Sequence, residues 1–356
     1  MNQIRPPAPQ LADIEPYDPK YIPAEVMVSA NENASDVPFE IRREVERAVR
    51  KVAFNRYPDP LANDLRDMIA EANGLDRDQV IIGNGGDELL FGIALAWGGP
   101  GRTFLNFPPT FTVYKNNAQL TNTEIVNIPR RADFSLDEDA IIERLSHGDI
   151  DFTIVTSPNN PSGNMASNEL VERMCEASDT LVMVDEAYFE FSRYTARPLL
   201  DRYENLVILR TFSKAFSLAG VRVGYLLGSE QAVRVFKKVR QPYSVDAVSQ
   251  AIARVIFENR AQFEKVINQI IEERGQLISA LNAMEGVEAF PSESNYVLFR
   301  MAEDVDAGTI WQQLLDRGVL IRDFSRTPGL ERCLRVSIGS PEENARFLSE
   351  LQDILA

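Results

Sequence analysis

A single lysine stands among residues that suit covalent chemistry. Lys214 follows Ser213 in the run Thr211-Phe212-Ser213-Lys214, and Arg222 lies eight positions further along the chain. An amine that forms an imine must be partly neutral, and hydroxyls with an arginine can hold the phosphate of an aldehyde cofactor against it. The pattern therefore predicts that Lys214 binds pyridoxal phosphate covalently, with Ser213 and Arg222 on the phosphate. A Ser-Lys pair is also common in surface loops, so other motifs must decide.

A second group of polar residues follows an apolar run. Residues 181–184 (LVMV) are typical of a buried parallel strand, and Asp185 and Tyr188 come soon after them. Ligands of open α/β sheets bind at the carboxyl ends of the strands. A carboxylate there can pair with a protonated pyridine nitrogen, and a phenol can form a hydrogen bond with the 3-oxygen of the ring. An Asp at a strand end is also common as a cap or in a structural ion pair.

Alternating strands and helices predict the elements that position these residues. This alternation is typical of a mainly parallel, doubly wound sheet. A turn rich in Asn, Pro and Gly, residues 157–163 (SPNNPSG), follows one of the strands. From about 245 to 283 a helical tract leads into a smaller α+β domain, and we expect the site in the cleft between the domains. The strands predicted for the large domain are 79–82, 103–106, 124–128, 152–156, 181–184, 206–209 and 223–227.

Three segments in order, SPNNPSG at 157–163, VDEAY at 184–188 and TFSKAFSLAGVRVGY at 211–225, resemble the aminotransferases of pyridoxal-phosphate fold type I. The most similar group is the histidinol-phosphate aminotransferases of class II. The resemblance implies an α/β fold with an N-terminal arm (1–30), a large cofactor-binding domain (31–240) and a small C-terminal domain (241–356) to which the arm contributes. It covers almost the whole chain, because it also includes EPYDP at 15–19, SANEN at 29–33, RYPD at 56–59, GNGGDE at 83–88, PPTF at 108–111, LIRD at 320–323 and CLRV at 333–336.

The resemblance implies a role for each matching residue around the cofactor. The backbone N–H groups of Gly86 and Asp87, at the start of a predicted helix, would bind the phosphate, and the positive helix end would favour it. Phe111 would stack on the pyridine ring, at a position where relatives commonly carry Tyr. Asn160 would hold the 3-oxygen of the ring together with Tyr188.

Other matching residues would bind the substrate or a second subunit. Tyr57 resembles a tyrosine that reaches the phosphate of the neighbouring subunit's cofactor, which implies an obligate homodimer with shared active sites. Arg335 resembles the arginine that binds the anionic group of the substrate, with Arg322 near it. Tyr17 and Asn33 are further candidates for substrate binding. The segment that begins at Asn31 reads NENASDVP, where the family has NENPxGP, so the loop around Asn33 departs from the family pattern.

The resemblance also implies a reaction. L-Histidinol phosphate and 2-oxoglutarate would exchange an amino group in a step of histidine biosynthesis, with Lys214 freed to move the α-proton. Arg335 suits this pair, since a guanidinium can bind a phosphate or a carboxylate through two hydrogen bonds. Three alternatives stay open: an aromatic amino acid aminotransferase, a threonine-phosphate decarboxylase, and a non-catalytic regulatory protein on the same fold.

Composition limits the class of protein. A chain of 356 residues with 44% hydrophobic content can bury a large core, and its length predicts two domains. The net charge, 37 minus 53 or −16, argues against nucleic acid or an anionic membrane as a partner. Cys175 and Cys333 lie far apart without a CxxC motif, which favours buried thiols in a reducing compartment. With no apolar leader and no run of membrane-spanning length, we expect a cytoplasmic protein.

The single histidine, His147, excludes several kinds of catalytic site. It stands before Gly148 in a segment typical of a helix end, so we expect it on the surface. Ser-His-Asp hydrolysis, Cys-His proteolysis and multi-histidine metal sites all need a histidine elsewhere. We therefore expect no metal, and acid-base chemistry must come from Lys, Tyr, Asp or Glu.

Overall fold

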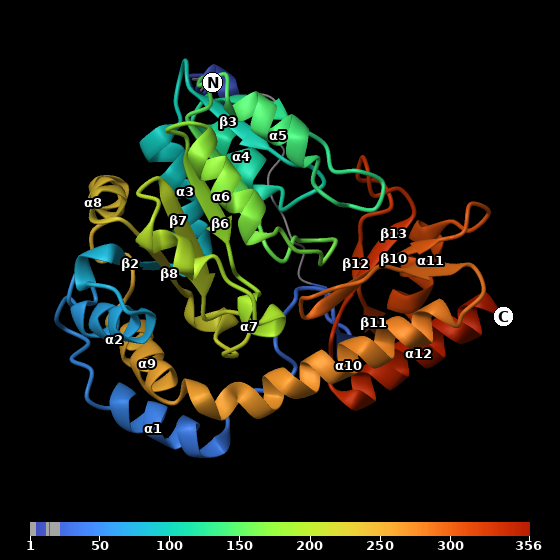
Figure 1. Ribbon diagram of the computed structural model, residues 1–356. Helices are drawn as coiled ribbons and strands as arrows, with labels where there is room; N and C mark the ends of the chain where they lie inside the picture. Colours follow the sequence, from blue (N-terminus) through green and yellow to red (C-terminus); the bar gives the residue numbers. More distant parts are fainter. Residues whose placement is uncertain (1–4, 12–13, 15–21) are drawn as a thin grey trace.

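The computed structural model describes residues 5–11, 14 and 22–356 (Figure 1). Tyr17, a predicted substrate contact, lies outside this range. Two sheets with surrounding helices make up most of the described chain. No helix in this part of the chain is long and apolar enough to cross a membrane. The described residues also contain five 3-10 helices: η1 (Pro9–Leu11), η2 (Arg77–Gln79), η3 (Arg197–Asp201), η4 (Ala219–Val221) and η5 (Arg260–Phe263).

The large sheet has seven strands in the order β2-β8-β7-β6-β5-β3-β4. β8 pairs antiparallel with both of its neighbours, and all the other pairings are parallel. The prediction of a mainly parallel sheet is confirmed. The strand bounds are β2 (Val80–Asn84), β3 (Thr103–Asn106), β4 (Glu124–Asn127), β5 (Phe152–Thr156), β6 (Leu181–Asp185), β7 (Leu206–Thr211) and β8 (Val223–Gly228).

Helices cover both faces of this sheet, because its central strands are apolar on both sides. In β6, Leu181 and Met183 belong to one core cluster, and Val182 and Val184 belong to another. Successive side chains of a strand point to opposite faces, so the two clusters are the two faces of a doubly wound sheet. The first face packs against α3 (Gly85–Trp97), α4 (Val113–Leu120) and α8 (Glu230–Val239), and the second against α5 (Glu138–Leu145) and α6 (Asn168–Ala177).

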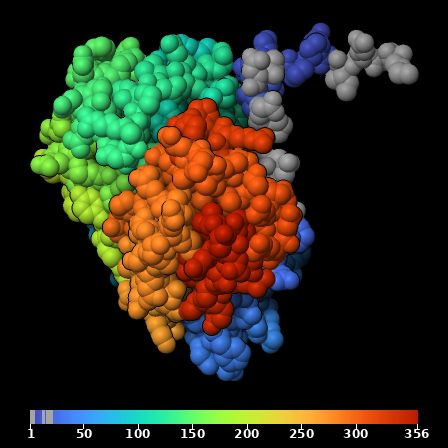
Figure 2. All heavy atoms as spheres, turned by 90° about the vertical axis from the view of Figure 1, so that its right-hand side faces the viewer, coloured from blue at the N-terminus to red at the C-terminus, as the bar shows by residue number. Residues whose placement is uncertain are grey.

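The small sheet has four antiparallel strands in the order β12-β13-β10-β9. Together with its helices it forms the orange and red lobe of Figure 2, beside the green part of the large-sheet layer. These elements are β9 (Val287–Ala289), β10 (Tyr296–Met301), β12 (Arg322–Asp323), β13 (Cys333–Ser337), α10 (Glu264–Asn282), α11 (Ala307–Asp316) and α12 (Pro341–Leu355).

The helix α9 (Ala247–Glu258) packs against α1 (Phe39–Val49) and α2 (Asn63–Asn73). The sequence-based boundary at residue 240 assigns α9 to the small domain, whereas these contacts join it to helices of the large one. After α9, α10 runs from the short helix α7 (Phe189–Ser192) toward β9, β10 and α12 (Figure 1). We therefore propose that the domain boundary lies near the start of α10.

The described N-terminal segment is joined to the small sheet region. β1 (Val26–Met27) pairs parallel with β11 (Val319–Leu320). The backbone N–H of Val28 then donates to Leu320, and the carbonyl of Val28 accepts from Ser337. These bonds place the next residues of the chain, 29–31, where the large sheet and the small sheet lie beside each other.

Candidate active site

One cavity of about 430 Å³ lies at the carboxyl ends of the parallel strands. Thr156, Asp185 and Thr211, the last residues of β5, β6 and β7, all line it. Its other walls come from α3, from the segment after β1, and from the small sheet. The structure thus brings most of the predicted site residues together: Gly86, Asp87, Phe111, Asn160, Asp185, Tyr188, Ser213, Lys214, Arg222, Arg322 and Arg335.

Asp185 is a buried carboxylate at the bottom of this cavity. Its Oδ1 accepts a hydrogen bond from the N–H of Ala187 at 3.0 Å, and its Oδ2 accepts one from the hydroxyl of Tyr114 at 2.6 Å. Burial raises the pKa of Asp185 to about 6, and the charges of Asp87 and Glu186 act in the same direction, although the two hydrogen bonds oppose them. Because ionisation of this buried carboxyl group is unfavourable, a cationic partner in the cavity would stabilise its charged form.

Lys214 extends into the cavity from the turn after β7. Its Nζ donates to the carbonyl of Ala30 at 3.1 Å. Burial lowers the pKa of Lys214 to about 8, and the charge of Arg335 is the next contribution in that direction. Arg222 also lowers the pKa of Lys214, but less than Arg335 does. A substantial fraction of the amine is therefore neutral near physiological pH, as a nucleophile or base requires.

Donor groups that suit an anion gather at one end of the cavity, where β7, β8 and α3 meet. The Arg222 guanidinium donates to Ser213 Oγ at 3.4 Å and to Asp87 Oδ2 at 2.9 Å. Gly86 and Asp87 lie in the first turn of α3, which has free backbone N–H groups and a positive dipole end. Gly85 has a φ of +70°, and a Cβ on it would lie 2.4 Å from Arg222 Nη2. A glycine is thus required for this arginine to approach the helix end.

Tyr188 and Asn160 also line the cavity. The buried Tyr188 hydroxyl accepts a hydrogen bond from Asn31 Nδ2 at 2.9 Å. Asn160 Oδ1 accepts a hydrogen bond from Arg335 Nη1. Asn160 therefore contacts the predicted substrate arginine in this structure.

Two arginines from the small sheet face the cavity together. Arg322 of β12 and Arg335 of β13 are direct partners in the antiparallel register, so their side chains lie on the same face. Arg335 is buried, donates to the carbonyl of Ser29 at 2.8 Å, and lies 5.4 Å from the centre of the Phe324 ring. Ile22, Met27 and Leu320 supply apolar lining beside them. This end can bind a dianion next to an apolar group.

Two candidate residues do not line the cavity. Tyr57 is 81% exposed and stacks on Tyr243, with their ring centres 4.5 Å apart. Asn33 donates through Nδ2 to the carbonyl of Ala215 at 3.2 Å and accepts from the N–H of Ser35. It thus holds its own loop against the lysine turn, which differs from the direct substrate contact that we predicted.

Sequence reasoning missed Tyr114, Asn31 and Phe324, which all line the cavity. Tyr114 is buried and touches Asp185 directly, and its ring packs edge-on against Phe111 at 5.6 Å. The spacing of three residues from Phe111 was the available signal, since the two residues are close in the chain where α4 begins, and the N–H of Tyr114 donates to the carbonyl of Phe111 at 3.3 Å. Among the described residues, no group of His, Cys, Asp or Glu side chains could hold a metal ion.

Comparison with known proteins agrees with this geometry. Residues 25–351 match the family model "Aminotransferase class I and II". The chain belongs to this family. Histidinol-phosphate aminotransferase 1 of Carboxydothermus hydrogenoformans is 38% identical over 355 residues, which is 100% of both chains. The corresponding enzyme of Chlorobaculum tepidum is 36% identical, covering 93% of this chain and 94% of its own. The resemblance noted in the sequence is confirmed.

Solved structures show the same fold. A histidinol-phosphate aminotransferase from Sinorhizobium meliloti, in complex with pyridoxal 5′-phosphate, superimposes with a TM-score of 0.89 at 23% identity, covering 99% of this chain and 98% of its own. An L-threonine-O-3-phosphate decarboxylase from Porphyromonas gingivalis has a TM-score of 0.80 at 25% identity, over 93% and 99% of the two chains. The predicted fold type I architecture is confirmed.

Proposed function

We propose that the chain is a pyridoxal-phosphate-dependent histidinol-phosphate aminotransferase that uses 2-oxoglutarate as the amino acceptor. The observation that carries this proposal is a single cavity with Lys214 and Asp185 at one end and Arg322 and Arg335 at the other. The relatives named as histidinol-phosphate aminotransferases, which are similar over the whole chain, support the same assignment.

The residues fit the cofactor. The N–H groups of α3, the Ser213 hydroxyl and Arg222 offer donors to a phosphate at one place. Buried Asp185 offers a carboxylate to a protonated ring nitrogen, and Lys214, whose pKa is lowered, lines the same cavity. Phe111 supplies an aromatic face in the same cavity. When bound, pyridoxal phosphate supplies an electron sink for the carbon that loses its proton.

The residues around the cavity then have defined roles in the reaction. Asp185 keeps a proton on the ring nitrogen by supplying a negative charge. Lys214 Nζ would take the proton from the α-carbon of the donor and pass it to the cofactor, and in the second half-reaction it would deliver a proton to the α-carbon of the acceptor. Arg335 and Arg322 bind the phosphate of the donor and, in the second half-reaction, a carboxylate of the acceptor. Residues of the small lobe and of the segment around Ala30 line the cavity opposite the large sheet.

We further propose a homodimer in the cytoplasm. Tyr57 is exposed beside Tyr243, and exposed Phe39 and Phe54 lie on the same stretch of chain. Exposed aromatic residues at this density favour a protein interface, and this supports a contact of Tyr57 with the partner's cofactor. Cys175 and Cys333 are both buried and unpaired, which is consistent with a reducing compartment.

The test is an assay of glutamate formation from 2-oxoglutarate with histidinol phosphate or phenylalanine as the donor. We expect kcat/KM to be higher for histidinol phosphate, because the two arginines bind its phosphate. The apolar lining by Met27, Leu320 and Phe324 favours an aromatic donor as the second candidate. Higher kcat/KM for phenylalanine would replace our assignment with that one. Carbon dioxide release from threonine phosphate without an oxo acid would indicate the decarboxylase instead.

A further inference from the structure

A buried ion pair lies behind the cavity. The side chains of Glu186 and Arg210 are 1% and 6% exposed, and Arg210 Nη2 lies 2.9 Å from Glu186 Oε2. Neither residue lines the cavity, but their sequence neighbours Asp185, Leu209 and Thr211 do. Because successive side chains of a strand alternate, Arg210 points to the face of the sheet opposite that of Leu209 and Thr211, which line the cavity, and its partner Glu186 lies on the same face as Arg210.

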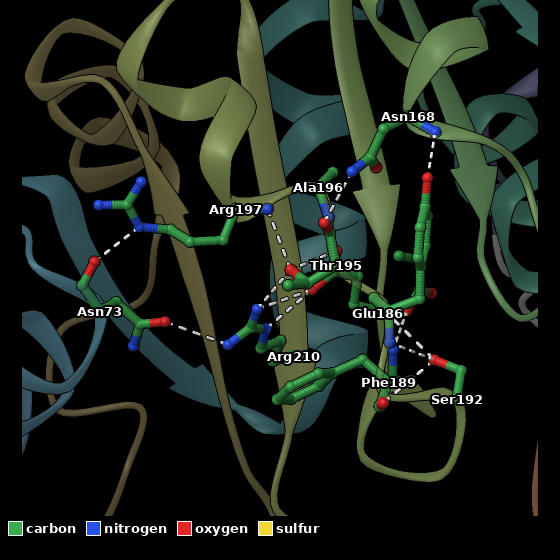
Figure 3. A network of polar contacts seen from close by, with 12 residues as sticks. Asn73, Asn168, Glu186, Phe189, Ser192, Thr195, Ala196, Arg197 and Arg210 are labelled. Atoms are coloured by element: carbon green, nitrogen blue, oxygen red, sulfur yellow. Dashed lines mark hydrogen bonds and ion pairs between the residues drawn. The ribbon is translucent and has the colours of Figure 1, made fainter.

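The side chain of Glu186 joins the two ends of a short segment of the chain. Its carboxylate accepts hydrogen bonds from the N–H of Ala196 at 2.6 Å and from the hydroxyl of Thr195 at 2.9 Å. Residues 186–196 thus form a loop that is tied at its two ends, as the dashed lines of Figure 3 show. This loop carries Tyr188, whose hydroxyl lines the active site.

Arg210 connects the closed loop to the strand that leads to Lys214. Its Nε donates to Glu186 at 2.9 Å, its Nη2 to Thr195 Oγ1 at 2.8 Å, and its Nη1 to Asn73 Oδ1 at 3.1 Å. The Phe189 ring covers the guanidinium at 3.7 Å. Arg210 is the fifth residue of β7 and stands four positions before the lysine. One guanidinium therefore contacts both ends of the loop, the strand and the end of α2.

An ion pair at this position needs an explanation. Burying two charges costs desolvation energy, and an apolar pair of the same size often stabilises a fold equally well. What a fully hydrogen-bonded pair adds is a fixed geometry, since the planar guanidinium accepts few alternative arrangements. Here the fixed elements are the two that deliver the catalytic side chains.

We propose that Glu186 and Arg210 are positioning residues that hold the Tyr188 loop and the end of β6 at a fixed place relative to Lys214. This inference rests on the proposed function for the identity of the cofactor. Asp185 immediately precedes Glu186, so a shift of the pair displaces the carboxylate at the ring nitrogen as well as the Tyr188 hydroxyl.

The test uses Arg210→Lys, which keeps the charge but loses the planar fork. The matched control is Glu264→Gln, which breaks the exposed ion pair between Arg193 and Glu264 on the outer side of the same loop. For each protein we would measure the unfolding temperature, the Kd of the apoprotein for pyridoxal phosphate, the visible circular dichroism of the bound cofactor, and kcat and KM.

We expect Arg210→Lys to fold and to show an altered circular dichroism band, because the cofactor contacts are displaced. Its kcat should fall by about 10-fold to 100-fold, as a displacement near 1 Å produces, while KM for 2-oxoglutarate changes by less than about 3-fold. The Kd for the cofactor should rise by roughly 10-fold. Glu264→Gln should keep the wild-type values.

A folded Arg210→Lys with wild-type circular dichroism, Kd and kcat would overturn the inference, and so would an equal loss in Glu264→Gln. If Arg210→Lys does not fold, Thr195→Val takes its place, since it removes the hydroxyl shared by Glu186 and Arg210. The same losses in that variant support the inference, and wild-type behaviour overturns it. If the wild-type chain binds no pyridoxal phosphate, the proposed function fails, and this inference fails with it.

Discussion

The two ends of the cavity are built in different ways. At the cofactor end, Asp185 is the last residue of β6, and Ser213 and Lys214 come shortly after the end of β7. These two neighbouring parallel strands have buried side chains on both faces. At the substrate end, Arg335 donates to the carbonyl of Ser29, 306 positions away in the chain. The cofactor end is thus part of one rigid sheet edge, whereas the substrate end exists only when the N-terminal segment and the small sheet meet.

The largest effect should come from Lys214→Ala, at the centre of the cofactor end. Without the amine, neither covalent attachment nor proton transfer at the α-carbon is available, so kcat should fall by about 10⁴-fold or more. The control Lys265→Ala removes an exposed lysine of α10 and should leave kcat unchanged. Retention of wild-type turnover by Lys214→Ala would remove the catalytic role of this residue.

At the same end, Asp185→Asn should reduce kcat on the order of 100-fold, since the ring nitrogen loses its negative partner. Tyr114→Phe keeps the carboxylate and removes the hydrogen bond to it at 2.6 Å, together with the hydrogen bond between the Tyr114 hydroxyl and Thr156 Oγ1 at 2.8 Å. The bond to the carboxylate lowers the pKa of Asp185, so its loss should raise this pKa and move the acid limb of the kcat/KM profile to higher pH. Profiles measured for both variants check these expectations; an unshifted acid limb in Tyr114→Phe would contradict the second.

At the substrate end, Arg335→Lys should raise KM for histidinol phosphate and for 2-oxoglutarate by about 10-fold each, because a lysine cannot form the bidentate contact. The Kd for pyridoxal phosphate should stay within about 3-fold of the wild-type value, because the cofactor end and the substrate end are built from different parts of the chain. Arg326→Lys, at an exposed position outside the cavity, serves as the control. Unchanged KM values for both substrates would exclude the role of Arg335.

The smallest effect concerns the coupling between the ends. The pKa of Lys214 is lowered to about 8, so the rate at which the apoprotein captures pyridoxal phosphate should rise about tenfold per pH unit and level off above about pH 8. The positive charge of Arg335 contributes to this lowering. Arg335→Met should therefore raise the pKa of Lys214 and move the pH profile of cofactor capture to higher pH. An unchanged profile would show that the charge of Arg335 does not affect Lys214.

Sequence reasoning was strongest at the cofactor end for a physical reason. Lys214, Ser213 and Arg222 lie close together in the chain, and Asp185 follows a strand that is recognisable by its apolar run. At the substrate end, the sequence named Arg322 and Arg335 but not the partners that surround them. One such partner, the carbonyl of Ser29, reaches Arg335 only because distant segments of the chain meet in three dimensions.

Two other features could not be derived from one sequence. A charged residue after an apolar run can be buried or exposed, so the sequence did not indicate that Glu186 has a buried partner. The contact between Glu186 and Arg210 depends on the parallel pairing of β6 with β7. Tyr57 lies outside the cavity of its own chain, and its predicted contact depends on a second subunit. Local motifs predict which functional side chains lie at the end of a strand. They do not predict which side chains from distant segments or from a second subunit contact them.

The most direct test of the account is a half-reaction measured without any oxo acid. The cofactor-loaded protein is titrated with histidinol phosphate in one cuvette and with phenylalanine in another, while the yellow absorbance of the bound cofactor is followed. The account predicts that the absorbance is lost at low histidinol phosphate and only at much higher phenylalanine. Loss at lower phenylalanine would contradict the donor assignment, and a protein that takes up no pyridoxal phosphate would contradict the central claim.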